Sequence, residues 1–195
     1  MKKVFLLLGV CCVALVSGVK AQEPGNIQVG AFADYYRSEA TGTNMFGVGG
    51  RLGFGILPHT LLEGELAYDF TQEYTSGFNN TSNGSISFYN TGVRTLHGLF
   101  GPRVILGHGP VRPFLEVKGG FINYMFDKAP PGYNAFANQV ANLRAQNMNA
   151  ALLAGGGVEG KLGPLGLRLD VGDEMYFNHG THNGLKVMFG PFLRF

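Results

Sequence analysis

Two short motifs contain residue types that could perform chemistry. The segment His179-Gly180-Thr181-His182 places a base two residues from a hydroxyl that a base can activate. Its H-x-x-H spacing also supplies two of the three or four ligands that a metal site needs. Gly155 to Gly160 matches the dinucleotide string G-x-G-x-x-G, but the turn Lys161-Leu162-Gly163-Pro164 follows where such a site needs a helix. We interpret the first motif as a hydrated loop and the second as small residues in a strand, and expect no cofactor and no metal.

A larger set of charged residues alternates with apolar ones, which is the period of a β-strand. Between Leu61 and Phe70, for example, every second residue is apolar except for one glycine, and three of the residues between them are carboxylates. Charges of both signs on one crowded face can satisfy one another, whereas an unpaired buried charge is costly. We therefore predict a structural ion-pair network formed by Arg51, Glu63, Glu65, Asp69, Arg103, Glu116, Lys118, Glu159, Arg168, Asp170 and Arg194.

The same alternation predicts eight strands, and the connections between them alternate in length. The strands are expected at Ile27 to Tyr36, Met45 to Leu57, Leu61 to Phe70, Gly92 to Leu106, Arg112 to Phe126, Met148 to Gly160, Gly166 to Phe177 and Gly184 to Phe195. Short turns at 58–60, 107–111 and 161–165 alternate with longer segments at 37–43, 75–91, 126–147 and 178–183. This sorting is typical of a transmembrane β-barrel with short periplasmic turns and longer extracellular loops.

Three finer features follow from this strand assignment. Pairing Leu57 with Leu61 across the 58–60 turn predicts that Gly55 faces Glu63, Gly53 faces Glu65 and Gly49 faces Asp69. Glycines then make room for carboxylates, and Arg51 is diagonal to two of them.

Within 135–147, the residues Phe136, Val140, Leu143 and Asn147 have helical spacing. This spacing predicts a short helix packed on the barrel mouth, or else a plug or ligand-contacting segment. An aromatic girdle is expected from Tyr35, Tyr68, Phe70, Tyr74, Phe88, Tyr89, Tyr124 and Tyr176.

The first 21 residues have the pattern of a secretory signal peptide: a basic start, an apolar stretch from Val4 to Val16, and small residues before Gln22. Removing this leader, with Lys2, Lys3 and Lys20, leaves 12 basic against 13 acidic residues, a net charge of −1. Nucleic acid is therefore not expected as a partner. Both cysteines also lie in the leader, which suits passage through an oxidising compartment. We expect residues 1–21 to be cleaved and 22–195 to form one barrel domain.

The final strand supports a membrane barrel over a soluble, lipocalin-like one. Phe189, Leu193 and Phe195 lie on the same face of this strand up to its last residue, although Pro191 interrupts the apolar pattern. This strand resembles the C-terminal signal that the barrel assembly machinery reads in bacterial outer-membrane proteins. The whole mature chain resembles the small eight-stranded barrels of the OmpX, OmpA-domain and opacity-protein group. The segments 100–103 and 112–114 are similar to those of the outer membrane protein beta-barrel domain family.

The resemblance implies an integral protein of the outer membrane, in contact with its lipids and lipopolysaccharide. It also implies a non-enzymatic role in envelope integrity or in surface interaction through the loops. Some barrels of this size are lipid A deacylases with a His-x-Ser pair; here Thr181 stands in place of the serine beside His179, and a lipid A-modifying hydrolase is the first alternative. A narrow channel is the second, although an eight-stranded barrel has an interior just filled by side chains.

Overall fold

A computed structural model describes residues 26–39, 42–80, 85–126 and 148–195, with side chains placed outside 74–91. The predicted leader at 1–21 and the predicted helix at 135–147 lie outside these residues. The strands are β1 (Ile27–Ser38), β2 (Thr43–Leu57), β3 (Thr60–Asn80), β4 (Ser85–Ile105), β5 (Val111–Phe126), β6 (Met148–Leu162), β7 (Leu165–Phe177), β8 (Thr181–His182) and β9 (Gly184–Arg194). In the described ranges, no helix is long and apolar enough to cross a membrane.

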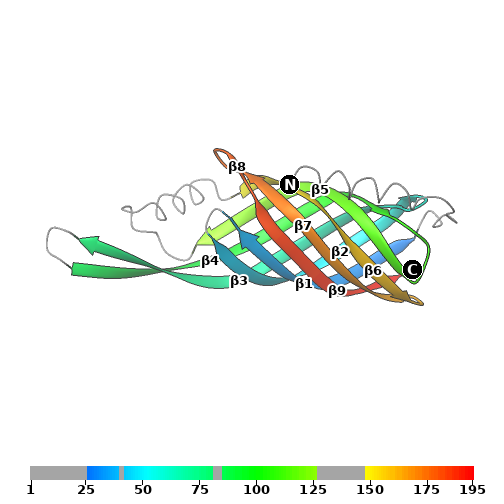
Figure 1. The fold of residues 1–195 in the computed structure, drawn as a ribbon, viewed down its shortest axis with the longest axis horizontal. Coiled ribbons are helices and arrows are strands. Elements are labelled where there is room, and N and C mark those ends of the chain that lie inside the picture. Colours follow the sequence, from blue (N-terminus) through cyan, green and yellow to red (C-terminus); the bar gives the residue numbers. More distant parts are fainter. Residues whose placement is uncertain (1–25, 40–41, 81–84, 127–147) are drawn as a thin grey trace, which may run out of the picture.

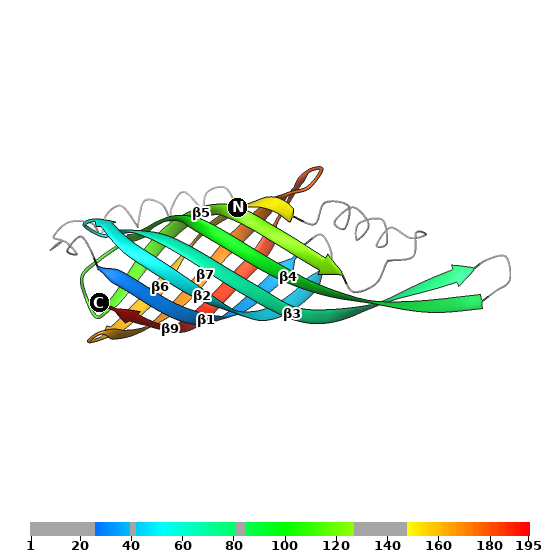
Figure 2. The ribbon, with the colours of Figure 1, turned by 180° about the vertical axis from the view of Figure 1, so that it is seen from behind.

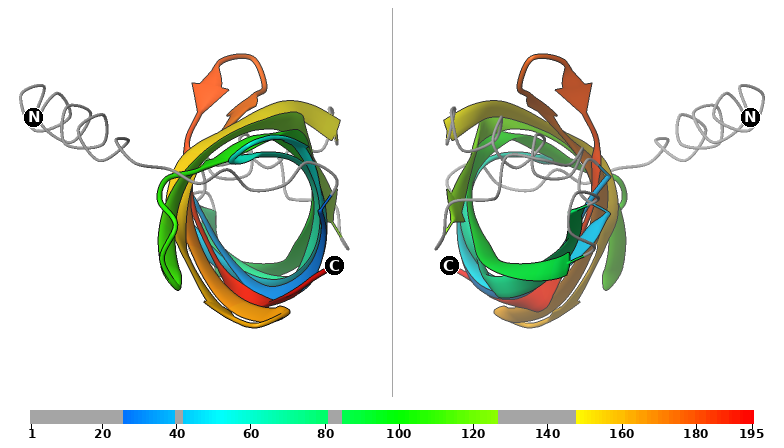
Figure 3. Two further views of the ribbon diagram at one scale, coloured as in Figure 1. Left: turned by 90° about the vertical axis from the view of Figure 1, so that its right-hand side faces the viewer. Right: turned by 90° about the vertical axis from the view of Figure 1, so that its left-hand side faces the viewer.

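Eight of the strands close into one antiparallel barrel. From β1 to β7 each strand pairs with the next, β7 pairs with β9, and β9 returns to pair with β1. The short β8 adds only to the end of β7. Figure 3 shows the closed ring in two views along the barrel. The predicted eight-stranded antiparallel barrel is therefore confirmed, and within the barrel wall each of the eight strands has a neighbour on both sides.

The connections alternate between the two barrel ends as the sequence predicts. Residues 58–59, 106–110 and 163–164 join strands at what we call the turn end, and 39–42, 81–84, 127–147 and 178–183 join them at the loop end. The C-terminus lies at the turn end, where Phe195 exchanges two backbone hydrogen bonds with Ile27 (Figure 1). The two ends of the barrel are thus built differently.

The predicted loop at 75–91 is wrong for most of its length. β3 continues to Asn80 and β4 begins at Ser85, and residues 73–80 pair with 85–92 in register. This β3–β4 extension (residues 73–80 and 85–92) projects beyond the barrel (Figures 1 and 2). The segment is rich in Ser, Thr, Asn and Gly, which is typical of loops. Two such segments can nevertheless satisfy each other's backbone groups as a hairpin, which composition alone does not reveal.

The outward face of the barrel is apolar and the inward face is polar. Phe46, Val48, Phe100 and Val117 are exposed by 51–58% on the outside, whereas the carboxylates and cations of the same strands are buried. This arrangement inverts that of a water-soluble barrel and suits hydrocarbon outside. The orientation predicted from the sequence is therefore confirmed.

The predicted register of β2 against β3 is wrong by two residues. Glu63 pairs with Gly53, Glu65 with Arg51 and Asp69 with Gly47, because the turn is tighter and the register shifts between Gly55 and Leu57. A shift of two leaves every side chain on its predicted face, since the side-chain period of a strand is two. It does, however, place Arg51 directly opposite a carboxylate instead of diagonal to two.

Candidate functional site: a charged barrel interior

The structure brings ten of the eleven predicted network residues into the lumen. Each of these ten is at most 7% exposed: Arg51, Glu63, Glu65, Asp69, Arg103, Glu116, Lys118, Glu159, Arg168 and Asp170. Arg194 instead lies half-buried at the turn end of β9. The strand alternation positions all ten, because residues two apart share a face of the strand.

Two cations organise the middle of the lumen. Lys118 Nζ lies 2.7 Å from Glu63 Oε1, 2.6 Å from Glu65 Oε2 and 2.9 Å from a Glu116 oxygen. Arg168 donates to Glu63 and Glu116 at 2.7 Å each and also pairs with Asp170. Each cation therefore joins three carboxylates that come from at least two strands.

Further arginines extend this arrangement toward both ends. Arg51 Nη1 lies 2.9 Å from Asp170 Oδ2. Arg103 lies 2.8 Å from Glu159 and 3.4 Å from Glu63, and Arg112 also pairs with Glu159. Sequence reasoning left out Arg112, because it is the second residue of β5, between a turn and a proline.

The resulting central network contains five cations and five carboxylates: Arg51, Arg103, Arg112, Lys118, Arg168, Glu63, Glu65, Glu116, Glu159 and Asp170. The buried Phe114 ring lies beneath it, 4.4 Å from the Arg168 guanidinium carbon. Balanced charge matters in so narrow a space, because each ion loses most of its hydration there.

A second group, the loop-end cluster, consists of Asp34, Asp69, His97, Glu174 and Lys186. Lys186 lies 2.8 Å from Asp34 and 3.2 Å from Glu174. His97 lies between two carboxylates, with Nε2 2.9 Å from Asp69 and Nδ1 2.7 Å from Glu174. Asp69, predicted as part of the single network, contacts His97 and Thr95 instead.

Four members of the loop-end cluster were missing from the predicted site: His97, and the three residues Asp34, Glu174 and Lys186 from the strands at which the barrel closes. Glu174 and Lys186 follow the polar phase of their strands, so strand alternation already marked them. Asp34 stands alone among apolar and aromatic residues of β1 and had no such signal. Only the closed barrel brings these three together, since β1, β7 and β9 meet only where the sheet closes.

The aromatic residues divide between the two faces. Tyr68 and Phe70 are 36% and 50% exposed on the outside, and Tyr35 is half-buried. Tyr124 and Tyr176 were wrongly predicted for the girdle: they are 2% and 0% exposed in the lumen, because they share the polar phase of their strands. The side chains of Tyr74, Phe88 and Tyr89 lie outside those described.

The buried tyrosines lie between the loop-end cluster and the loop end of the barrel. Tyr36 follows Asp34 on the same face of β1, and Tyr176 likewise follows Glu174 on β7. The Tyr36 and Tyr124 hydroxyls are 3.4 Å apart, and the Tyr36 ring packs edge-on against His97 at 4.9 Å. These side chains separate the loop-end cluster from the loop end.

Neither sequence motif forms the chemical site that its spacing could suggest. His179 Nδ1 lies 2.7 Å from Asn178 Oδ1 instead of a carboxylate, and His182 stacks on Tyr176 at 5.0 Å. The glycines of 155–160 lie within β6, where a methyl group on Gly157 would overlap the Leu169 carbonyl and the Phe114 ring. The motif thus marks close approach of neighbouring strands and not a phosphate-binding turn.

One titratable group outside the membrane-spanning strands is perturbed. His59, in the β2–β3 turn, packs 5.0 Å from the His108 ring of the next turn. Partial burial lowers the pKa of His59, and the charges of His108 and Arg112 lower it further. All three causes disfavour the protonated ring.

The C-terminal strand β9 closes the barrel between β7 and β1. Phe189, Leu193 and Phe195 point outward and are 53%, 45% and 73% exposed. β9 pairs with β1 on one side and β7 on the other, and its pairing with β1 is interrupted opposite Gly190 and Pro191. Because proline has no N–H, this interruption lies where a ladder donor is absent.

The fold and the polar interior together define the class of this protein as a small eight-stranded membrane-type β-barrel. Comparison with solved structures finds the same fold in Neisserial surface protein A, with 12% identity over 87% of this chain and 96% of that chain and a TM-score of 0.53. Ail of Yersinia pestis and outer membrane protein W of E. coli align at 14% identity over 89% of this chain and all of theirs, with TM-scores of 0.48. No protein-family model and no curated protein matches the sequence.

Proposed function

We propose that this protein is a non-enzymatic integral barrel of the outer membrane that acts in envelope integrity or surface contact through its loop end. The observation that carries the proposal is the combination of an apolar exterior with an interior packed by paired charges. Such an exterior requires lipid around it, here outer-membrane lipids and lipopolysaccharide. Such an interior leaves the loop end, with the β3–β4 extension, as the part available to partners.

The central network is the structural element of this proposal. Its ten charges are joined by ion pairs across the lumen and come from β2 to β7. Cross-lumen pairs hold opposite walls together, and breaking one leaves a buried charge without compensation. We infer that the network stabilises the barrel and blocks the passage of solutes.

The proposal also includes how the protein is exported and assembled into the membrane. Residues 1–21 direct export and are then removed, and Phe189, Leu193 and Phe195 present the outward apolar row that the barrel assembly machinery reads. Their exposure by 45–73% on the closing strand supports this role, because a recognition signal must be accessible before the strand inserts.

Cysteine labelling tests the placement of the two ends. Residues 22–195 contain no cysteine, so a single introduced thiol reports on one position. A membrane-impermeant maleimide should label Ser85→Cys, at the start of β4, on intact cells. It should label His108→Cys, in an exposed turn-end position, only after permeabilisation. Equal labelling of both in intact cells would contradict the proposal.

The two alternatives have direct tests. Overexpression of the wild-type protein and of a Thr181→Ala variant should give the same lipid A species by mass spectrometry, and a change seen only with wild type would favour the hydrolase. Planar-bilayer recordings should show no conductance steps, because the central network fills the lumen.

The proposed surface contact has its own test. Replacing the β3–β4 extension with a short turn should reduce adhesion of cells while the barrel still folds.

A further inference from the structure

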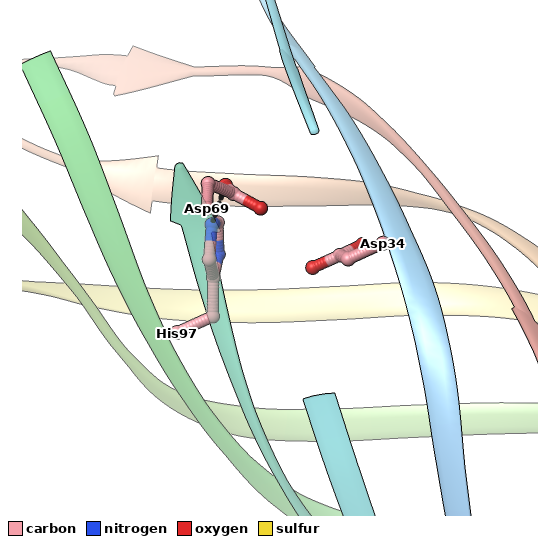
Figure 4. A group of neighbouring side chains, drawn as sticks. All are labelled: Asp34, Asp69 and His97. Carbon is pink, nitrogen blue, oxygen red and sulfur yellow. Dashed lines mark hydrogen bonds and ion pairs between the residues drawn. The ribbon is translucent and has the colours of Figure 1, made fainter. Parts of the chain in front are cut away.

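The loop-end cluster contains two carboxylates with an unused oxygen each. Asp34 on β1 is 2% exposed and Asp69 on β3 is fully buried. Their Oδ2 atoms bond to Lys186 and His97, but each Oδ1 is buried without a hydrogen-bond partner among the described residues. Figure 4 shows the two carboxylates and the His97 ring facing a common space. Buried oxygens of this kind are costly unless something satisfies them.

The space between them depends on a glycine. Gly47 on β2 pairs in register with Asp34 on one side and Asp69 on the other. A methyl group at Gly47 would overlap Asp69 Oδ1 and the Tyr68 carbonyl. Without that side chain, the two carboxylates approach each other across an intervening strand.

The imidazole is oriented as in many metal sites. His97 Nδ1 lies 2.7 Å from Glu174 Oε1, and Nε2 points at Asp69. A metal-binding histidine usually donates one ring N–H to a carboxylate, which fixes the tautomer that presents the other nitrogen to the ion. Glu174 is placed to accept that hydrogen bond.

The donor atoms are close enough for one ion. One ligand atom each from Asp34, Asp69 and His97 lie within 4.8 Å of one another, and this is the one such group of three found in the described part of the chain. Donors about 2.0–2.2 Å from a tetrahedral Zn²⁺ are about 3.5 Å apart, so the most widely separated pair of these three donors would approach by at most about 1 Å. Side-chain rotation around the Gly47 gap provides that movement.

The charge of the loop-end cluster also favours a cation. Asp34, Asp69 and Glu174 supply three carboxylates, and Lys186 is the one lysine or arginine among the five residues, so the carboxylates exceed the fixed cations by two. A divalent ion bound among these side chains would offset that excess. The central network, by contrast, is already balanced and has no such need.

We propose that Asp34, Asp69 and His97 bind one divalent transition-metal ion of the Zn²⁺ type, with Glu174 as the positioning residue for His97. The ion forms one bond to His97 Nε2, whose proton is released to solvent, and one to an oxygen of each aspartate. The mixed nitrogen and oxygen donors favour Zn²⁺ over Mg²⁺ or Ca²⁺, which prefer oxygen alone. The site is separate from the loops of the proposed function and does not depend on them.

Calorimetry with the full barrel tests the proposal. Chelator-treated, folded protein in detergent should bind one Zn²⁺ per chain and release about one proton, measured by repeating the titration in buffers of different ionisation enthalpy. Asp34→Asn and His97→Gln should weaken binding by more than about 100-fold, and Glu174→Gln by about 10–100-fold. Asp173→Asn, exposed on the outer face of β7, is the matched control and should bind like wild type.

Further measurements distinguish this site from other places where Zn²⁺ could bind. His179→Gln should leave binding intact; loss of binding in that variant instead of His97→Gln would place the ion in the β7–β9 loop and overturn the proposal. The absence of saturable Zn²⁺ binding, or equal competition by Mg²⁺, would also overturn it. If a variant does not fold, imidazole NMR of the wild type decides: Zn²⁺ should shift His97 Nε2 and leave the Nδ1 proton in place.

Discussion

Arg168→Met should strongly destabilise the barrel. The guanidinium is 2% exposed and pairs with Glu63, Glu116 and Asp170. Its loss leaves four cations against five carboxylates in the central network. The three carboxylates keep other partners, because Lys118 contacts both glutamates and Arg51 contacts the aspartate. We therefore expect a loss of about 3–5 kcal/mol, as for one partner removed from a buried pair, and not three times that amount.

Reversible urea unfolding in lipid vesicles, followed by gel mobility, measures this change in the free energy of unfolding. The double variant Arg168→Met with Glu116→Gln restores equal numbers of charges and should recover part of the loss. Arg37→Met, at an exposed position near the loop end, is the control and should change stability little. A loss below about 1 kcal/mol, typical of an exposed ion pair, would refute the structural role of the central network.

Three other perturbations have defined outcomes. Val117→Arg, on the outer face midway along β5, should cost about 2–4 kcal/mol of unfolding free energy, whereas Leu162→Arg at the turn end should cost at most about 1 kcal/mol; equal costs would contradict a lipid-facing exterior. Phe195→Ala should reduce the heat-modifiable, folded fraction in the outer membrane, and Leu57→Ala should not. Identical folded yields of the two variants would contradict the proposed role of Phe195 in the assembly signal. The lowered pKa of His59 means that the unfolded chain binds its proton first, so stability should decline as pH falls below about 6.5 until the folded-state pKa is passed; in His59→Gln that part of the pH profile should be absent.

Sequence reasoning placed charged residues on the inward face of a strand where that strand alone carried the information. Glu63, Glu65, Arg168 and Asp170 lie in segments whose alternation is clear, and the structure brings them together in the lumen. Asp34 has no charged neighbour in its phase and was missed. The assignment of Tyr124 and Tyr176 to the girdle failed because aromatic type was given more weight than strand phase. In both strands the phase alone places the tyrosine inside.

The register of β2 and β3 shows the limit of local reasoning. The position of the turn was predicted correctly, but its length in residues was not. One residue fewer in the turn shifts the pairing by one, and the irregularity between Gly55 and Leu57 adds the second residue of the shift. The β3–β4 extension shows the same limit, since its backbone groups are satisfied only by pairing with each other.

The sequence by itself determined the strand number, the inward and outward faces and the alternation of short and long connections. These depend on a period of two and on turn-forming residues, and both are local properties of the chain. The tertiary structure decided which charges meet. Arg168 reaches Glu63 and His97 reaches Glu174 only across the closed lumen, so their partners follow from the stagger and closure of the barrel. For the same reason the division into a balanced central network and an acidic loop-end cluster became visible only in three dimensions.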